Sequence, residues 1–369
     1  MTHMPSTTMN RRRFVCLGTE AALVTGAAGM FSQTALTAEQ LGSSAPATKP
    51  DFPIVDTHQH LWDLSKVRLS WLTPGGPLTR NFVMKDYLEA AAGLGIVRAV
   101  YMEVDVDVDS QLAEAEYVLD LCRRGGSPTV AAVIGGCPGE DSFKAYITRF
   151  KGSPFIKGVR QIPRAAAGGQ SPYRQKRFIE SIRLLGELAM RFDLCPPPSG
   201  LSDAIQLVDK CPGTQFILDH CGNADPKWYR SPGKDETTDA AAARRRAAEQ
   251  WRRDIAALAK RNNVVCKISG IVSQATKASW TSDDLAPIIN HCLEVFGPDR
   301  VMFAGDWPVC TGVATLRQWV RALKQVVHNR SMEQQRKLFC DNAVRVYGLA
   351  NPGAVMSRGS PPGDPRGCR

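Results

Sequence analysis

The chain has 369 residues, of which 43% are hydrophobic and 22% are charged, a composition that excludes collagen-like, coiled-coil and intrinsically disordered proteins. Its length allows either one large fold or two domains of roughly 150 residues each. The net charge of +10 does not indicate a nucleic-acid partner, because no recognisable nucleic-acid-binding module accompanies it and the arginines of residues 244–253 fall on the solvated faces of a predicted helix.

The first part of the chain predicts an export signal. Arg11, Arg12 and Arg13 are followed by a mostly small and apolar stretch over residues 17–31, which is the pattern of a twin-arginine signal. We therefore assign residues 1–47 to a signal and linker and expect a periplasmic protein. The apolar stretch is too rich in Gly, Thr and Ala for a membrane span, and no other run approaches 18 apolar residues, so we expect no stable membrane insertion of the mature protein.

The eleven cysteines are scattered along the chain and form no CxxC pair, so they do not predict a disulfide framework. Cys195, Cys221 and Cys266 lie in apolar, strand-like segments. In such segments a cysteine is more often a small buried hydrophobic residue than a metal ligand.

Strand and helix patterns alternate along the rest of the chain. Short apolar or β-branched segments predict eight strands, over residues 54–58, 97–103, 130–135, 156–161, 192–195, 215–220, 264–269 and 301–306. Helical periodicity predicts helices over residues 85–94, 110–123, 142–150, 177–190, 201–210, 240–261 and 285–296. The alternation predicts a single α/β fold, a (β/α)8 TIM barrel over residues 51–349, followed by a disordered tail over residues 350–369. A doubly wound open sheet is the alternative, but no GxGxxG motif or P-loop opens any helix.

Polar residues close five of the predicted strands. They are Asp56, His58 and His60 at the first strand, Glu103 at the second, Arg160 at the fourth, His220 at the sixth and Asp306 at the eighth. In a barrel these strand ends form the rim that carries the active site. Because side chains alternate along a strand, His58 and His60 project from the same face. Together with His220 and Asp306 they could complete a mononuclear site that holds zinc and leaves one position for water.

Six short segments identify a known family. They are Val55–Asp63 (VDTHQHLWD), Met102–Val104 (MEV), Lys157–Gln161 (KGVRQ), Ile217–Gly222 (ILDHCG), Cys266–Gly270 (CKISG) and Phe303–Pro308 (FAGDWP). In this order they resemble the strand-end motifs of the amidohydrolase superfamily, and in particular its amidohydrolase-2 branch. That branch contains TIM-barrel, metal-dependent hydrolases, among them sugar-acid lactonases and dicarboxylate lactonases. The resemblance extends from about residue 52 to residue 349 and implies a hydrolase.

The resemblance also implies roles for the polar residues. His58 and His60 match the HxH pair of the first strand, and His220 matches the histidine of a later strand. Asp306 matches the aspartate of the last strand that acts as the base toward the hydrolytic water. This makes Asp306 and His220 the expected catalytic residues, and it makes all four the expected ligands of one divalent metal ion, zinc in the first place. Some members of the branch need no metal, so the same residues also allow a metal-independent reaction.

Three further residues are expected to contact the substrate. Arg160 matches a position at which a cation receives a substrate carboxylate in the dicarboxylate lactonases. Glu103 matches an acid that is a substrate contact or a further metal ligand in the sugar-lactonase relatives. An internal ion pair between Arg160 and Glu103 is the alternative. Trp62 could line the pocket or pack its loop onto the barrel.

The expected reaction is hydrolysis of a small lactone, the cyclic ester of a sugar acid or of a carboxylated ring, by water activated at Asp306. The substrate is expected to be anionic or sugar-derived. Non-oxidative decarboxylation of an aromatic acid and a non-catalytic, secreted carbohydrate-binding barrel are the alternatives. The loops over residues 61–83, 163–177 and 223–239 should rise on the same rim. They offer five candidate contacts, which are Arg164, Tyr173, Arg174, Lys227 and Trp228.

Overall fold

The computed structural model describes residues 52–164, 169–231, 236–277 and 279–350. The predicted export signal and residues 351–369 of the predicted tail lie outside this part of the chain. The eight strands are β1 Ile54–Gln59, β2 Ile96–Met102, β3 Thr129–Gly135, β4 Ile156–Arg160, β5 Arg191–Leu194, β6 Gln215–Leu218, β7 Val264–Ile268 and β8 Val301–Phe303. They form one sheet in chain order, and every neighbouring pair is parallel. The predicted (β/α) barrel is confirmed.

The sheet closes on itself through the chain that follows β8. The backbone N–H of Asp306 donates to the carbonyl of His58 at 2.9 Å, and the N–H of His60 donates to the carbonyl of Trp307 at 2.8 Å. These bonds place the histidines of β1 and the aspartate after β8 on adjacent chain segments. Residues 58 and 306, far apart in the sequence, are therefore neighbours.

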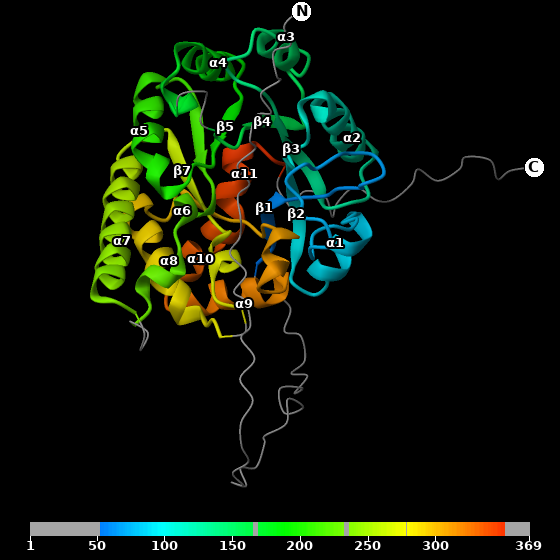
Figure 1. Ribbon diagram of the computed structural model, residues 1–369. Helices are drawn as coiled ribbons and strands as arrows, with labels where there is room; N and C mark the ends of the chain where they lie inside the picture. Colours follow the sequence, from blue (N-terminus) through cyan, green and yellow to red (C-terminus); the bar gives the residue numbers. More distant parts are fainter. Residues whose placement is uncertain (1–51, 165–168, 232–235, 278, 351–369) are drawn as a thin grey trace, which may run out of the picture. The chain divides into compact units, whose positions relative to one another are not determined.

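Helices surround the strands in Figure 1. The α-helices are α1 Met84–Ala91, α2 Gln111–Arg124, α3 Phe143–Thr148, α4 Lys176–Glu187, α5 Leu201–Lys210, α6 His220–Asn223, α7 Thr238–Ala259, α8 Ser282–Phe296, α9 Leu316–Val326, α10 Met332–Arg336 and α11 Asn342–Tyr347. A π-helical turn, η8 Lys337–Asp341, joins α10 to α11. The 3-10 turns are η2 Val108–Ser110, η3 Pro172–Arg174, η4 Pro198–Gly200, η5 Pro226–Tyr229, η6 Ile271–Gln274 and η7 Val309–Gly312. No helix of the described residues is both long and apolar enough to cross a membrane.

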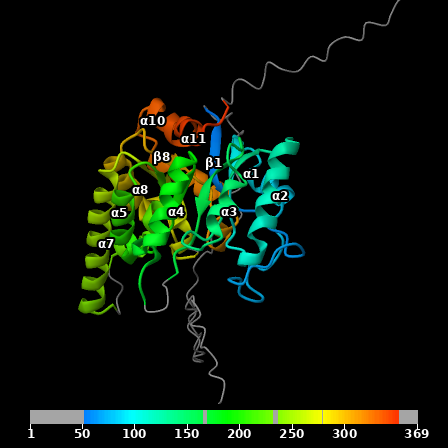
Figure 2. The same ribbon diagram turned by 90° about the horizontal axis from the view of Figure 1, so that it is seen from above.

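One end of the barrel is closed by the last helices. Inside the strands, Val100, Ile217 and Met302 pack against Tyr347 of α11 in a separate core cluster. The Asn342 side chain donates to the carbonyl of Val301, the first residue of β8, at 2.8 Å. In Figure 2, α10 and α11 lie at one end of the strands and the loop after β1 lies at the other. Only the carboxyl ends of the strands are therefore left to form a site.

Several strands end earlier than the sequence predicts. β6 ends at Leu218 and β8 at Phe303, whereas the patterns extended them to His220 and Asp306. Both of these residues have a left-handed backbone, with φ of 54° and 53°, which a strand does not tolerate. The chain therefore leaves the ladder before it presents these two side chains.

Asp56 does not join the other polar residues of the first strand. Its carboxylate accepts bonds from the N–H of Gly305 at 2.7 Å and from the hydroxyl of Tyr87 on α1 at 2.9 Å. These contacts direct Asp56 away from the histidine group. The pairing of β1 with β2 is irregular between Asp56 and Gln59, and such a shift changes the face to which the following side chains point.

Candidate active site

Three imidazoles converge on one carboxylate oxygen. The Nε2 atoms of His60, His58 and His220 lie 3.5, 3.8 and 3.9 Å from Oδ1 of Asp306. The four residues come from β1, from the loop after it, from α6 and from the loop after β8, and all four are buried. The convergence that the strand-end pattern predicted is therefore present in the structure.

The hydrogen bonds of Nδ1 orient these rings. Nδ1 of His60 lies 3.0 Å from the carbonyl of Met102, which can only accept, so this nitrogen carries a proton and Nε2 is the atom directed at Asp306. Nδ1 of His220 is 2.9 Å from the Ser269 hydroxyl. Nδ1 of His58 lies 3.4 Å from the carboxylate of Asp219. Burial lowers the pKa of His58 well below its ordinary value, more than Asp219 raises it, so this ring is neutral at pH 7.

The backbone around His220 has an unusual conformation, and it places the imidazole ring close to Gly270. His220, Cys221, Gly222 and Asn223 all have positive φ, between 53° and 69°, an arrangement that concentrates strain in α6. The ring of His220 lies directly over Gly270, where an added Cβ would stand 2.4 Å from its Cγ and Nδ1. Only glycine at position 270 therefore leaves room for the imidazole.

Arg160 and Glu103 form an ion pair beside the histidines. Nε of Arg160 donates to the Glu103 carboxylate at 2.5 Å, and Nη2 donates to the Glu103 carbonyl at 2.8 Å. Nη1 lies 3.2 Å from Nε2 of His58. Both side chains are 4% exposed. The sequence left an internal ion pair open as the alternative to substrate contact, and the geometry is that of the ion pair.

A second group of buried charges lies next to Nδ1 of His58. It was not predicted from the sequence. Nζ of Lys267 on β7 is 2.6 Å from the carboxylate of Asp193 on β5 and 3.1 Å from that of Asp219. All three side chains are completely buried. Burial on its own lowers the pKa of Lys267, but the two carboxylates raise it above the ordinary value, so the ammonium is charged. A lysine and an aspartate within otherwise apolar strands were the signal that could have revealed this group.

Trp62, the predicted aromatic contact, packs inside the loop that follows β1. Trp62 is 2% exposed, its Nε1 donates to the carbonyl of Arg80 at 2.7 Å, and its ring packs against Phe82. This is the packing arrangement that the sequence offered as the alternative. Trp71 is 40% exposed, and its Nε1 donates to the carbonyl of Val104, the residue after Glu103. Trp71 therefore presents more aromatic surface near the rim than Trp62.

Three of the five candidate contacts from the loops have partners within the fold. Tyr173 is buried against Phe178 and Phe192. Arg164 forms an ion pair with Asp105, and Arg174 forms one with Asp203 at 2.6 Å.

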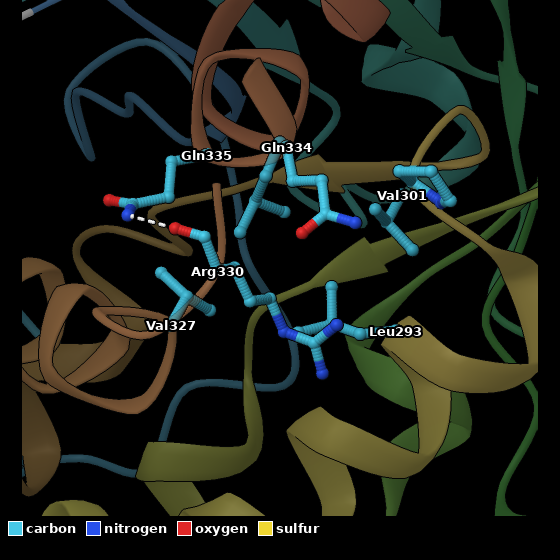
Figure 3. A pocket seen from close by; sticks show the side chains of 8 residues that line it. Leu293, Val301, Val327, Arg330, Gln334 and Gln335 are labelled. Carbon is cyan, nitrogen blue, oxygen red and sulfur yellow. Dashed lines mark hydrogen bonds between the residues drawn. The ribbon is translucent and has the colours of Figure 1, made fainter. Parts of the chain in front are cut away.

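One cavity of the described residues lies away from this site. Figure 3 shows its lining, which includes Leu293, Val301, Val327 and Arg330. Val301 is the first residue of β8, whereas Asp306 follows the end of that strand. The cavity therefore lies toward the closed end of the barrel and contains none of the predicted site residues.

His58, His220 and Asp306 fit a divalent metal ion, because their ligand atoms all lie within 4.8 Å of one another. His60 is not part of this group, although its Nε2 lies 3.5 Å from Oδ1 of Asp306. Zinc at about 2.0–2.1 Å from nitrogen would separate tetrahedral ligand atoms by roughly 3.3–3.5 Å, and the separations of Nε2 from Oδ1 are a few tenths of an ångström longer at most. Nε2 of His58 is shared with Arg160, so it could ligate an ion only if Arg160 gave up this contact.

Comparison with known proteins agrees with the fold. L-fucono-1,5-lactonase of Burkholderia multivorans is 26% identical over 308 residues, which cover 81% of this chain and 97% of the relative. L-rhamnono-gamma-lactonase of Scheffersomyces stipitis is 23% identical over 348 residues, which cover 81% of this chain and 99% of the relative. A crystal structure of an amidohydrolase from Burkholderia multivorans with bound zinc superposes with a TM-score of 0.67 at 22% identity, over 81% of this chain and all of that one.

The family model described as amidohydrolase matches residues 55–349. This range includes all of the barrel except Ile54, the first residue of β1, and it includes the four residues that converge at the open end. The protein is therefore a member of the amidohydrolase family.

Proposed function

We propose that the protein hydrolyses the lactone of a small sugar acid, with water activated by Asp306. The observation that carries the proposal is the position of Asp306 Oδ1, within 3.9 Å of three Nε2 atoms at the open end of the barrel. A carboxylate at this position, next to the imidazoles or to a metal ion that they hold, can accept a proton from water. The two lactonase relatives support the choice of a cyclic ester.

In the proposed reaction the same proton moves twice, first from water to Asp306 and then from Asp306 to the ring oxygen. Asp306 would take a proton from the water as its oxygen attacks the ring carbonyl, and would return it to the ring oxygen when the ester bond breaks. The product is the open-chain hydroxy acid. His220 would hold the water or the developing oxyanion, since its Nε2 is 3.9 Å from Asp306. A divalent ion held by His58, His220 and Asp306 would lower the pKa of the water and polarise the carbonyl.

The contacts of Arg160 indicate which class of lactone is the substrate. Its guanidinium donates twice to Glu103 and is 4% exposed, so it is not free to receive a substrate carboxylate. A sugar-acid lactone has no carboxylate, because its carboxyl group forms the ring ester. We therefore propose a neutral sugar lactone in preference to a lactone with carboxylate substituents. Glu103 then positions Arg160, and Trp71 offers an aromatic face for a sugar ring.

Metal removal tests the proposed zinc ion. We expect the purified protein to contain about one zinc ion per chain, and we expect dialysis against a chelator to abolish lactone opening until zinc is added back. Elemental analysis of the protein before and after dialysis, with parallel assays, measures both quantities. Full activity of metal-free protein would show that the imidazoles and Asp306 act without an ion.

Substitution of Gly270 tests the placement of His220. In Gly270→Ala the new methyl group would stand 2.4 Å from the imidazole, so the ring must move, and we expect kcat to fall by about 100-fold. Gly125→Ala is the matched control, because Gly125 also has a positive φ, 63°, but no atom lies within 4 Å of an added Cβ. Equal activity of the two folded variants would contradict the proposed role of His220.

We also propose that the protein is exported through the twin-arginine pathway, on the basis of Arg11, Arg12 and the apolar stretch that follows them. In a bacterial host, the full-length chain should appear in the periplasmic fraction. The variant Arg11→Lys with Arg12→Lys should stay in the cytoplasm. Equal distribution of both proteins would contradict the proposal.

A further inference from the structure

A group of three cysteines lies outside the proposed active site. Cys221 is in α6, Cys266 is on β7 and Cys292 is on α8. Their sulfur atoms all lie within 4.8 Å of one another. All three are free thiols, and all three are completely buried. Three separate elements of the fold therefore bring sulfur to one point, although the sequence predicted only small buried hydrophobic residues at Cys221 and Cys266.

The cysteine group lies on the helix side of the barrel wall. Cys221, Cys266 and Cys292 belong to the core between strands and helices, whereas Val265, the neighbour of Cys266, belongs to the core inside the barrel. Trp251 on α7 donates from Nε1 to the carbonyl of Cys221 at 2.8 Å. The three sulfurs are therefore enclosed by apolar side chains and are separate from the group around Asp306.

We propose that Cys221, Cys266 and Cys292 form a binding site for a soft monovalent cation, for which Cu(I) is the probe of choice. Thiolate sulfur selects soft ions such as Cu(I) over hard ions such as Mg²⁺ or Ca²⁺. A metal-to-sulfur bond of about 2.3 Å, as in zinc thiolates, separates three trigonal sulfurs by about 4 Å. The observed separations, all within 4.8 Å, need only small side-chain movements to reach this geometry.

The number of ligands and the burial favour a monovalent ion over zinc. Structural zinc takes four ligands, but among the described residues the group contains three sulfurs and no fourth ligand. His220, the nearest ligand type in sequence, is bonded through Nδ1 to Ser269 and directs Nε2 to Asp306. A monovalent cation that replaces one thiol proton leaves the site neutral. A divalent ion with three thiolates would leave a buried negative charge, which is costly in an apolar core.

Competition with a chromophoric Cu(I) chelator under anaerobic conditions tests the proposal. The full-length protein is incubated with the Cu(I) complex, both as folded protein and during refolding, because a completely buried site loads only when the fold opens. We expect wild type to withdraw a single copper ion per chain. Cys292→Ser should bind it at least about tenfold more weakly. Cys122→Ser, which removes a buried thiol on α2, is the control and should bind as wild type does.

X-ray absorption of the copper-loaded wild type gives a second readout that needs no variant. We expect two or three sulfur neighbours and no nitrogen or oxygen neighbour. Nitrogen neighbours would place the copper at the histidines and overturn the proposal. Equal copper retention by folded Cys292→Ser and wild type, or no retention by either, would also overturn it. These outcomes do not depend on lactone hydrolysis.

Discussion

Asp306→Asn is expected to lower kcat for lactone opening by at least about 1,000-fold, within the range of general base catalysis. The amide keeps the size of the side chain but cannot take a proton from water. It also removes the negative charge that faces three Nε2 atoms at 3.5–3.9 Å, so the affinity for a metal ion should fall as well. Stopped assays with a sensitive acid indicator measure the residual rate.

The control for this variant is Asp299→Asn. Asp299 precedes β8, as Asp306 follows it, but its side chain is 65% exposed and pairs with Lys337. Its loss should leave kcat unchanged and should alter stability by less than about 0.5 kcal/mol. If Asp306→Asn folds, as judged by circular dichroism, and keeps the rate of wild type, then another group activates the water.

Lys267→Met is expected to lower the free energy of unfolding by about 3–5 kcal/mol. The ammonium of Lys267 lies between the carboxylates of Asp193 and Asp219 at 2.6 and 3.1 Å, with all three side chains completely buried. Methionine has a similar length and no charge, so two buried carboxylates would lose their common partner. Urea unfolding followed by circular dichroism measures the loss.

Two further variants identify the cause of this loss. Lys260→Met removes an exposed lysine at the end of α7 and should change the stability by less than about 0.5 kcal/mol. Lys267→Met combined with Asp193→Asn removes one of the two stranded charges and should recover part of the lost stability. A loss below about 1 kcal/mol in the single variant would mean that the network is not held together by charge.

The position of the proposed active site could be predicted from the sequence, because it depends on the periodic patterns of the eight strands. The eight strand patterns predict a barrel, the carboxyl ends of its strands meet at one rim, and His58, His60, His220 and Asp306 all follow strand patterns. The two-residue repeat of a strand cannot reveal a change of register such as the one between Asp56 and Gln59, so the contacts of Asp56 with Gly305 and Tyr87 could not be predicted. The helices after β8 were not assigned, although they close the far end of the barrel.

The network around Lys267 and the cysteine group were missed for a different reason. Each depends on which residues of distant elements meet, such as Asp193 on β5 with Lys267 on β7, or Cys221 in α6 with Cys292 on α8. A single sequence shows that a charge or a thiol lies within an apolar segment, but not which partner faces it. The partnership of Arg160 with Glu103 was foreseen only because both close strands of the same barrel.

Acid release from a neutral sugar-acid lactone, measured by titration at constant pH with zinc-loaded protein, tests the central claim most directly. The five-membered and six-membered lactones of fuconic and rhamnonic acids form the panel, together with a lactone that carries carboxylates and a hydroxybenzoic acid. We predict opening of a neutral sugar lactone, weaker opening of the carboxylated ring, and loss of both in Asp306→Asn. Release of carbon dioxide from the hydroxybenzoic acid, with every lactone left intact, would contradict the account.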